Sequence, residues 1–425
     1  MKKWLLVSAL FLLVALPTKA ETIDLQYLID ATPAGGELHL QDGIYKGSFL
    51  INKPIKIIGS EHTILQGTTK ETLLRIENTN DVKLENLQLK TAETGISVKK
   101  VKRLYLSGLK LTSIYSGIQF YYAEGAKVAK TEIQGVEGHY SKKGNGVTIF
   151  NSKRLQMNGL KINQVQDGVY IENVSQIELQ NNIVSNSRYG IHFMYTEGAK
   201  AIENTFNKNV TGIMLMMTKQ TDLQRNEINE QNGLNGFGVV LFDAQNIDVK
   251  GNIFRNNRTA ISAQKLQQST LKENRFQMNQ NAVELIRSNT DNSVIENDFI
   301  GNIVNLRSDG SETTVQHNYY DDYDGIDVDG DGIGDRSYVA LQSFGQWMVR
   351  QPVYQYFIES PSVVLLNEID KQTNKIETDQ LVDKKPRMMS LQSVEQPRKQ
   401  NIGRIVMGVA IILCGLWLWR REVTI

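Results

Sequence analysis

The chain has 425 residues but contains a single cysteine, Cys414, and only 7 prolines. One thiol cannot build a disulfide framework, an iron–sulfur cluster or a zinc site with several thiolates. The chain also has no excess of charge of one sign, because its formal net charge is only +1. We therefore expect no nucleic-acid partner. The proportions of hydrophobic residues, 40%, and charged residues, 22%, are those of a folded globular protein.

Two short motifs recur along the chain. The first places Gly or Ala before an Ile or Val that begins an alternating strand, and it occurs at Gly95, Gly117, Gly146, Gly168, Gly190, Gly212, Gly238, Ala260 and Ala282. Neighbouring positions differ by 22, 29, 22, 22, 22, 26, 22 and 22 residues. The second is an Asn followed two residues later by an apolar residue, at Asn182, Asn204, Asn226, Asn252, Asn274, Asn297 and Asn318. Both series contain a step of 26 residues at the same place, so the repeat is not accidental.

A 22-residue unit with short alternating strands is typical of one coil of a parallel β-helix. A single coil cannot bury its apolar face, so coils must stack. The sequence predicts an all-β fold, a right-handed parallel β-helix over residues 21–320, followed by a short helical C-terminal segment. We expect the repeated glycines to open strands at tight turns. We also expect the repeated asparagines to occupy turns, where Asn tolerates the left-handed conformation.

The two ends of the chain predict export and anchoring. Residues 1–20 combine two lysines, an apolar run and small residues, which is typical of a signal peptide, either cleaved or retained as an anchor. Residues 404–420 are predicted to form a transmembrane helix, which includes Cys414. The polar residues 369–403 are predicted to be a flexible tether. The body is then extracytoplasmic and C-terminally membrane-anchored, and any metal bound there is held by His, Met or carboxylate.

Side chains alternate along a strand, so the second and fourth residues after each repeat Gly should point outward. These positions are occupied by His192 and Met194 on one coil, and by Met214 and Met216 on the next. Thioether and imidazole ligands favour Cu(I) over hard cations. The four residues therefore form a candidate Cu(I) site. The alternative is an apolar contact patch covered by a loop or a partner, because Met fills irregular surfaces.

Residues 321–368 are predicted to contain an acidic cation loop and a C-terminal docking segment. Alternating carboxylates before a Gly turn converge on a hard cation, and the loop offers Asp327, Asp329, Asp331 and Asp335 for Ca²⁺. The bidentate Glu of an EF-hand is missing. A solvated acidic turn is the first alternative. A catalytic role for Asp321, Asp322 and Asp324 is the second, because acid catalysts need a partly desolvated cleft.

Two segments of the sequence resemble the NosD family. Its members are exported β-helical proteins of nitrous oxide reductase maturation. The two segments are RYGIHFMY at Arg188–Tyr195 and NYYDDYDGIDVDGDGIGDRSY at Asn318–Tyr338. The resemblance implies a non-enzymatic accessory protein that helps to supply copper to the reductase. It also implies an ABC-type ATPase and permease and a copper chaperone as partners, with Ser343–Ile369 docking onto the permease. Whether copper or a sulfur species is the passenger stays open.

Two other functions fit the fold. The first is a surface-anchored carbohydrate-active β-helix enzyme, a polysaccharide lyase or epimerase. Such an enzyme needs a basic groove with an Arg or Lys base near carboxylates, whereas the outward columns are rich in aromatic and thioether side chains. The second is a purely structural scaffold.

Overall fold

The computed structural model describes residues 24–288, 291–309, 313–340, 352–357, 360–363, 365–366, 369 and 381–391. The predicted signal peptide (1–20) and transmembrane helix (404–420) lie outside these ranges. None of the helices within the ranges has the length and apolar character needed to span a bilayer. The chain divides into two units, residues 1–214 and residues 215–425.

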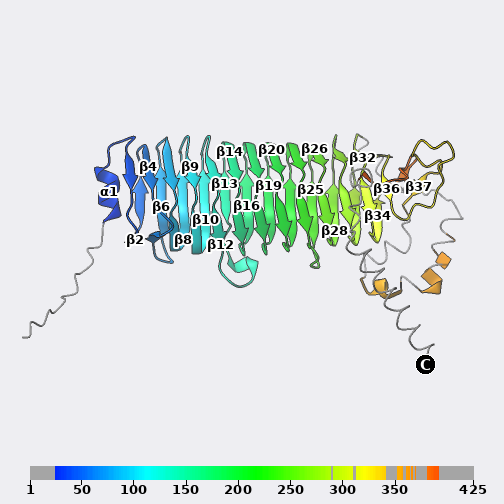
Figure 1. The fold of residues 1–425 in the computed structure, drawn as a ribbon, viewed down its shortest axis with the longest axis horizontal. Coiled ribbons are helices and arrows are strands. Elements are labelled where there is room, and N and C mark those ends of the chain that lie inside the picture. The colour runs from blue at the N-terminus through cyan, green and yellow to red at the C-terminus, as the bar shows by residue number, and fades with distance from the viewer. Residues whose placement is uncertain are drawn as a thin grey trace, which may run out of the picture. The chain divides into compact units, whose positions relative to one another are not determined.

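Unit 1 is a stack of parallel strands with α1 (Leu25–Ala31) at its N-terminal end (Figure 1). The side chain of Asp24 caps the helix by accepting hydrogen bonds from the amides of Gln26 and Tyr27. The first face of the stack comprises β1 (Glu37–His39), β4 (Ile55–Ile58), β7 (Val82–Glu85), β9 (Tyr105–Ser107), β11 (Lys127–Ala129), β14 (Lys153–Asn158), β17 (Ser175–Gln180) and β20 (Glu197–Ile202).

The other two faces of unit 1 share the long strands β8 (Gln88–Lys99) and β10 (Lys110–Tyr121). The second face adds β2 (Gly43–Lys46), β5 (Thr63–Gln66), β12 (Glu132–Gln134), β15 (Lys161–Asn163), β18 (Ile183–Ser185) and β21 (Thr205–Asn207). The third adds β3 (Phe49–Ile51), β6 (Thr72–Glu77), β13 (Val147–Phe150), β16 (Asp167–Glu172) and β19 (Tyr189–Met194). The division between the units falls within β22 (Thr211–Met216).

Unit 2 has the same three-faced construction. Its first face is β23 (Lys219–Gln224), β26 (Gln245–Lys250), β29 (Thr270–Lys272), β32 (Ser293–Ile295) and β35 (Thr314–Gln316). Its second is β24 (Glu227–Asn229), β27 (Ile253–Arg255), β30 (Arg275–Gln277), β33 (Asp298–Ile300) and β36 (Tyr319–Tyr320). Its third is β25 (Phe237–Phe242), β28 (Thr259–Gln264), β31 (Asn281–Ile286) and β34 (Val304–Ser308). The shorter elements β37 (Tyr338–Val339), η2 (Pro352–Phe357) and β38 (Val382–Asp383) follow.

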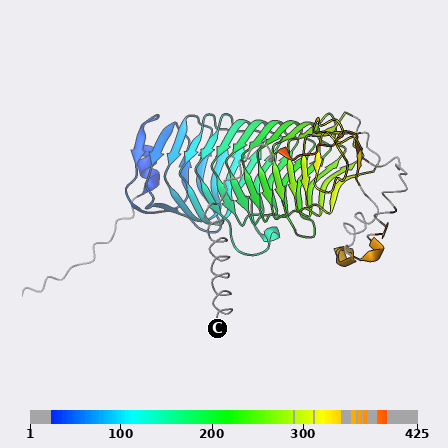
Figure 2. The same cartoon turned by 45° about the vertical axis from the view of Figure 1, so that its right-hand side comes forward.

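The 22-residue period is confirmed as the register between stacked strands. In unit 1, Val147 pairs with Val169, which pairs with Ile191. In unit 2, Val239 pairs with Ile261. These residues are 0–1% exposed, as expected for the inward columns. Each unit is therefore a parallel β-solenoid of the right-handed type, and successive coils lie side by side within it (Figure 2).

The repeated glycines are required by close approach between coils, which differs from the predicted tight turns. Gly95 does not have a positive φ. A Cβ added to it would lie 2.8 Å from the carbonyl oxygen of Gly117 on the next coil and 2.8 Å from Cδ2 of Leu111. Any side chain at this position would push neighbouring coils apart.

The repeated asparagines lie at the corners between strands, as predicted, but they are not left-handed and instead form buried ladders. In unit 1, Oδ1 of Asn204 accepts hydrogen bonds from the backbone N and Nδ2 of Asn182, at 3.0 and 2.8 Å. The residue before each of these, Asn181 or Glu203, takes the positive φ instead. The asparagine side chain replaces a backbone partner at the corner of the coil and links one coil to the next.

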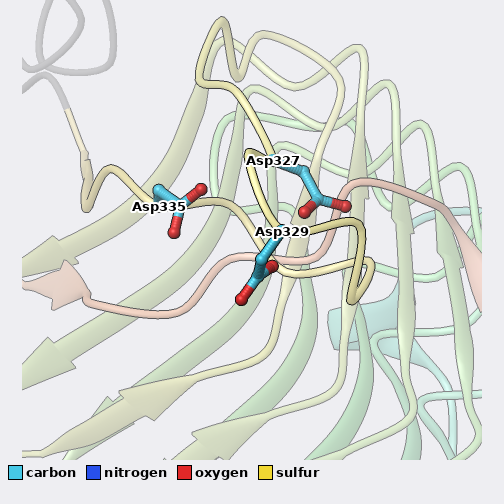
Figure 3. Close-up of side chains that lie close together, drawn as sticks. All are labelled: Asp327, Asp329 and Asp335. Carbon is cyan, nitrogen blue, oxygen red and sulfur yellow. The ribbon is translucent and has the colours of Figure 1, made fainter.

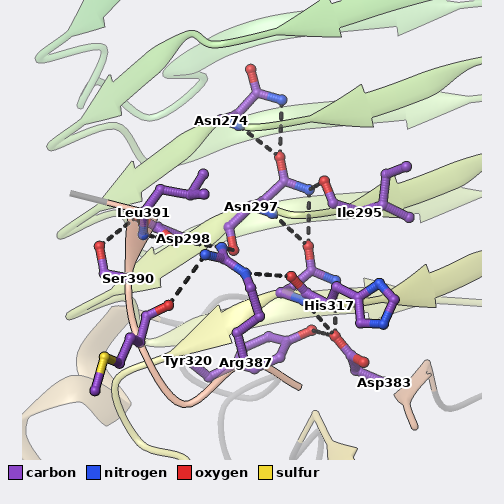
Figure 4. A network of polar contacts seen from close by, with 12 residues as sticks. Asn274, Ile295, Asn297, Asp298, His317, Tyr320, Asp383, Arg387, Ser390 and Leu391 are labelled. Atoms are coloured by element: carbon purple, nitrogen blue, oxygen red, sulfur yellow. Dashed lines mark hydrogen bonds and ion pairs between the residues drawn. The ribbon is translucent and has the colours of Figure 1, made fainter. Parts of the chain in front are cut away.

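Unit 2 carries the same ladder through Asn252, Asn274, Asn297 and Asn318. At its end the next partner is Asp383, fully buried on β38, which pairs antiparallel with β37 (Figure 4). Arg387 reaches the buried carboxylate of Asp298 at 2.8 Å and the carbonyl of His317 at 2.7 Å. We call residues 381–391 the C-terminal strap. The strap is part of the predicted tether, so the prediction of a flexible segment over 369–403 does not hold for these residues. Their polar side chains pair with buried groups at the end of unit 2.

Candidate functional site

The candidate site lies on the third face of unit 1, where β16 and β19 run side by side. The register places Tyr170 beside His192 and Glu172 beside Met194. As predicted, the alternate residues of these strands fill the core, and Phe193 and Ile171 are fully buried. His192 and Met194 therefore face away from the core. His192 is nevertheless only 7% exposed, because other side chains of the same face surround it.

The two ring nitrogens of His192 have different surroundings. Nδ1 lies 3.4 Å from Oδ2 of Asp167. Nε2 is buried and has no hydrogen-bond partner among the described residues. The rings of Tyr170 and Tyr189 pack edge-on against the imidazole, with centroids 5.1 and 4.9 Å away. An unpaired buried nitrogen is costly, and Nε2 is therefore the atom of His192 that is available to a ligand.

Asp167 and Arg188 form an ion pair beside the imidazole, with a buried carboxylate and a half-buried guanidinium. Nε and Nη2 of Arg188 each donate to one carboxylate oxygen of Asp167 at 2.7 Å, and Asp167 is completely buried. This bidentate contact raises the pKa of the Arg188 guanidinium above its ordinary value. The guanidinium also lies over the ring of Tyr189, 4.5 Å from its centroid. The pair offsets the charge that Asp167 brings into the interior.

Tyr170 connects the thioether to a carboxylate. Its hydroxyl lies 2.6 Å from Oε2 of Glu172 and 3.2 Å from the sulfur of Met194. Burial is the main cause that raises the pKa of Tyr170, and the contact with Glu172 adds to it. The hydroxyl therefore stays protonated at neutral pH and donates.

Met214 occupies on the next coil the position that His192 occupies on its own coil. The amide of Thr211 donates to the carbonyl of Arg188 at 2.8 Å, which sets β22 beside β19 at this end. Met214 follows its repeat glycine by two residues, as His192 does, and is half-buried like Met194. Met216 lies two residues further along β22, beyond the division, and is also half-buried. Unit 1 thus places Met214 on the coil next to the coil of His192 and Met194.

The insertion between β12 and β13 borders this site. It accounts for the 29-residue step from Gly117 to Gly146 in the repeat. It contains η1 (Tyr140–Lys142), capped by His139, and projects from the coils of unit 1 between β12 and β13 (Figures 1 and 2). Its last residues bond to the coil of the site, since the amide of Gln166 donates to the carbonyl of Gly144 at 2.9 Å. The side chain of Asn145 accepts from the amide of Asp167 at 3.2 Å. The insertion therefore supports the segment that carries Asp167.

The sequence prediction missed Asp167, Arg188 and Tyr189. A signal for Asp167 was present, because it precedes a repeat glycine in a column whose other members are uncharged. They are Thr94, Ser116, Asn145, Tyr189, Thr211, Phe237, Thr259 and Asn281. A single acid in a buried column requires a cation, and Arg188 supplies it.

The predicted cation loop brings three of its four carboxylates together. Oxygen atoms of Asp327, Asp329 and Asp335 lie within 4.8 Å of one another (Figure 3). Asp331 is not in this group, and its Oδ1 accepts from the amide of Ile333 at 2.7 Å. The amides of Gly332 and Gly330 donate to Asp327 and lower the pKa of its carboxyl. The loop thus holds an ionised carboxylate at its centre.

A family of known proteins matches the segment of this chain that contains the candidate site. Residues 129–325 match the family described as "Periplasmic copper-binding protein (NosD)". A curated relative from Stutzerimonas stutzeri, named "Probable ABC transporter binding protein NosD", is 26% identical over 125 residues. That match covers 28% of this chain and 29% of the relative. The resemblance to NosD predicted from the sequence is confirmed.

Solved structures share the fold. Tailspike protein 3 of bacteriophage CBA120 has a TM-score of 0.57 and 10% identity, over 71% of this chain and 56% of the tailspike chain. The A-module of mannuronan C-5 epimerase AlgE6 from Azotobacter vinelandii has a TM-score of 0.48 and 12% identity, over 69% of this chain and 93% of the module. The tailspike supports the β-solenoid fold alone. The likeness to the epimerase is too low to support a function.

Proposed function

Because residues 129–325 match the periplasmic copper-binding NosD family, we propose that this chain is an extracytoplasmic accessory protein that handles copper for nitrous oxide reductase. One observation carries the proposal. The buried Nε2 of His192 lacks a hydrogen-bond partner in the described part of the chain, and it lies on the same outward face as the thioether of Met194. The segment matched to the family contains both residues. No catalytic step is assigned to the chain.

The proposed ligands of Cu(I) are His192, Met194, Met214 and Met216. Thioether sulfur and neutral imidazole are soft or borderline ligands that suit Cu(I), and none of them needs to lose a proton to bind. Binding and release then require no proton transfer from the thioethers. The three methionines are half-buried, whereas the core residues beside them, such as Phe193 and Leu215, are fully buried.

The proposed partners follow from the family and from the relative's name. We assign to this chain an ABC-type ATPase and permease, a copper chaperone as donor and nitrous oxide reductase as recipient. In this proposal Cu(I) passes from the chaperone to the His/Met site and then towards the reductase. Anchoring through residues 404–420 and docking through Ser343–Ile369 stay predictions.

The test is a titration of the full chain with Cu(I) under oxygen-free, reducing conditions against a colorimetric chelator. The wild-type chain is expected to withdraw one Cu(I) from the chelator, and a variant with all four ligands changed to Ala should withdraw none. Met278→Ala with Met389→Ala is the control, because these two methionines are 63% and 67% exposed and outside the site. Equal stoichiometry and affinity in the wild type and the quadruple variant would remove the proposal.

Asp327, Asp329 and Asp335 are proposed to bind Ca²⁺, with a structural role. The convergence of their oxygens favours a hard cation, which prefers carboxylate ligands. Asp331 lies outside the group and is assigned to the turn. This role is separate from the copper site and has its own test below.

A turnover assay distinguishes the proposed accessory function from the alternative of a carbohydrate-active enzyme. A polysaccharide lyase or epimerase would convert uronic-acid oligomers, and an accessory protein would not. Turnover at rates typical of enzymes would overturn the accessory function.

A further inference from the structure

The ion pair beside His192 is not explained by copper ligation alone. Asp167 is completely buried, and its carboxylate faces two groups, the guanidinium of Arg188 and Nδ1 of His192. A bidentate pair with Arg188 would already satisfy the charge. The position of Nδ1, 3.4 Å from Oδ2, indicates a second role for the carboxylate.

The chemistry of the two groups selects one form of the imidazole. A neutral imidazole carries its proton on one nitrogen and a lone pair on the other. A carboxylate accepts hydrogen bonds only, so it attracts an N–H and repels a lone pair. Nδ1 faces Asp167, and the proton therefore belongs on Nδ1. The lone pair is then on Nε2, the buried atom that has no partner among the described residues.

The surroundings of the ring fix its orientation as well. Tyr170 and Tyr189 pack edge-on against the imidazole, with interplanar angles of 87° and 74°. Tyr189 is itself covered by the guanidinium of Arg188. Arg188 thus orders both the carboxylate and one of the rings that hold His192. A flipped imidazole would place the Cδ2–H group against Asp167 and lose the contact of Nδ1.

We propose that Asp167, held by Arg188, is a positioning residue that keeps His192 in the Nδ1–H tautomer and so presents the Nε2 lone pair to the metal. This proposal rests on the proposed Cu(I) function and names the ligating atom and the residues that prepare it. Hydrogen bonds from ligating histidines to carboxylates commonly fix the tautomer and strengthen the metal site. Asp167 does not touch the metal in this arrangement.

The first experiment measures the tautomer without any metal. The full chain is labelled with ¹⁵N in its histidine rings, and a long-range ¹H–¹⁵N correlation spectrum reports which nitrogen is protonated. The chain has only 5 histidines, and His192→Gln assigns the signal of interest. The expected result is a protonated Nδ1 and a bare Nε2. A proton on Nε2 overturns the proposal.

Asp167→Asn is the test variant, because the amide keeps the size of the side chain and can donate as well as accept. We expect it to reduce or reverse the preference for the Nδ1–H tautomer. Asp298→Asn is the matched control, since Asp298 is also buried and paired with an arginine, Arg387, but has no hydrogen bond or ion pair to an imidazole among the described residues. The control should lose stability and leave the His192 signal unchanged. An unchanged His192 tautomer in Asp167→Asn overturns the proposal.

The second experiment measures Cu(I) affinity by competition with a chelator. Loss of such a supporting group typically weakens a metal site about 10–100-fold, and we expect Asp167→Asn to weaken Cu(I) binding by that factor. Asp298→Asn should bind as the wild type does. Wild-type affinity in Asp167→Asn overturns the positioning role. If the wild-type chain binds no Cu(I), the proposed function fails, and the tautomer spectrum still decides whether Asp167 orients His192.

Discussion

Asp383 accepts two hydrogen bonds from Asn318, from its backbone N at 2.9 Å and from its Nδ2 at 3.0 Å. These are the same two contacts that each ladder asparagine receives from the coil before it, as Asn318 does from Asn297. An aspartate from the C-terminal strap, 65 residues further along the chain, therefore occupies the position of the next asparagine. The ladder of unit 2 ends without an unpaired amide.

Removing this end contact should destabilise unit 2. Asp383→Ala leaves the buried amide of Asn318 without its acceptor, which costs about 1–3 kcal/mol of unfolding free energy. Asp383→Asn should cost clearly less, because its Oδ1 can accept the same two hydrogen bonds as an asparagine does elsewhere in the ladder. Urea unfolding of the three proteins measures the difference. Equal stability of Asp383→Ala and the wild type would contradict the end-capping role.

The buried tyrosine beside this contact predicts a loss of stability in alkali. Burial, reinforced by the charge of Asp383, holds the pKa of Tyr320 well above its ordinary value near 10. The folded state therefore keeps the hydroxyl protonated after the unfolded chain has begun to ionise. The stability contributed by this group is fully present below about pH 10, and it is lost as the pH rises above that value.

The measurement is the unfolding free energy of the wild type and of Tyr320→Phe between pH 8 and pH 11. The slope above about pH 10 should be smaller in the variant, because one ionising group has been removed. Tyr27→Phe is the control, since Tyr27 is 69% exposed and should leave the slope unchanged. Identical slopes in all three proteins would refute the assignment to Tyr320.

The period and the inward columns could be predicted from the sequence because they depend on local alternation and on a repeat that recurs many times. The roles of single polar residues could not. The asparagines fit a turn by their intrinsic preference, and only the stacking of coils turns them into ladder partners. Asp167 needs a cation from the next coil, which alternation along one strand does not reveal.

The strap was missed for a related reason. Residues 381–391 have no apolar period and therefore resemble a tether. They bind through polar side chains, and Asp383, Arg387 and Ser390 all pair with groups on the last coils. Hydrophobic periodicity carries no information about such contacts.

The close approach of coils at Gly95 predicts that this position does not tolerate even one methyl group. Gly95→Ala places a Cβ against the carbonyl of Gly117 and the side chain of Leu111, and overpacking of this kind costs about 1–3 kcal/mol. Gly233→Ala is the control, because no atom lies within 4 Å of an added Cβ and its φ is not positive. That change should lie within about 0.5 kcal/mol of the wild type. Thermal unfolding compares them, and a neutral Gly95→Ala would contradict the packing described.

The cation loop predicts a melting temperature that depends on Ca²⁺. A cation that binds only the folded chain stabilises it by mass action, so EDTA should lower the melting temperature and excess Ca²⁺ should restore it. Asp327→Asn with Asp329→Asn should abolish this dependence. Asp331→Asn should retain it, because Asp331 lies outside the converging group. A melting temperature that EDTA does not change would remove the calcium proposal.

Because of the asparagine ladder, the contact that ends unit 2 does not depend on the number of coils in the unit. Every internal step joins one asparagine to another, and only Asn318 meets a different residue. A duplicated 22-residue segment between Asn252 and Asn274 would present the same donors and acceptors at both of its borders. Duplication or deletion of a whole coil would therefore change the length of this unit and leave the contacts of the strap with Asn318 as they are.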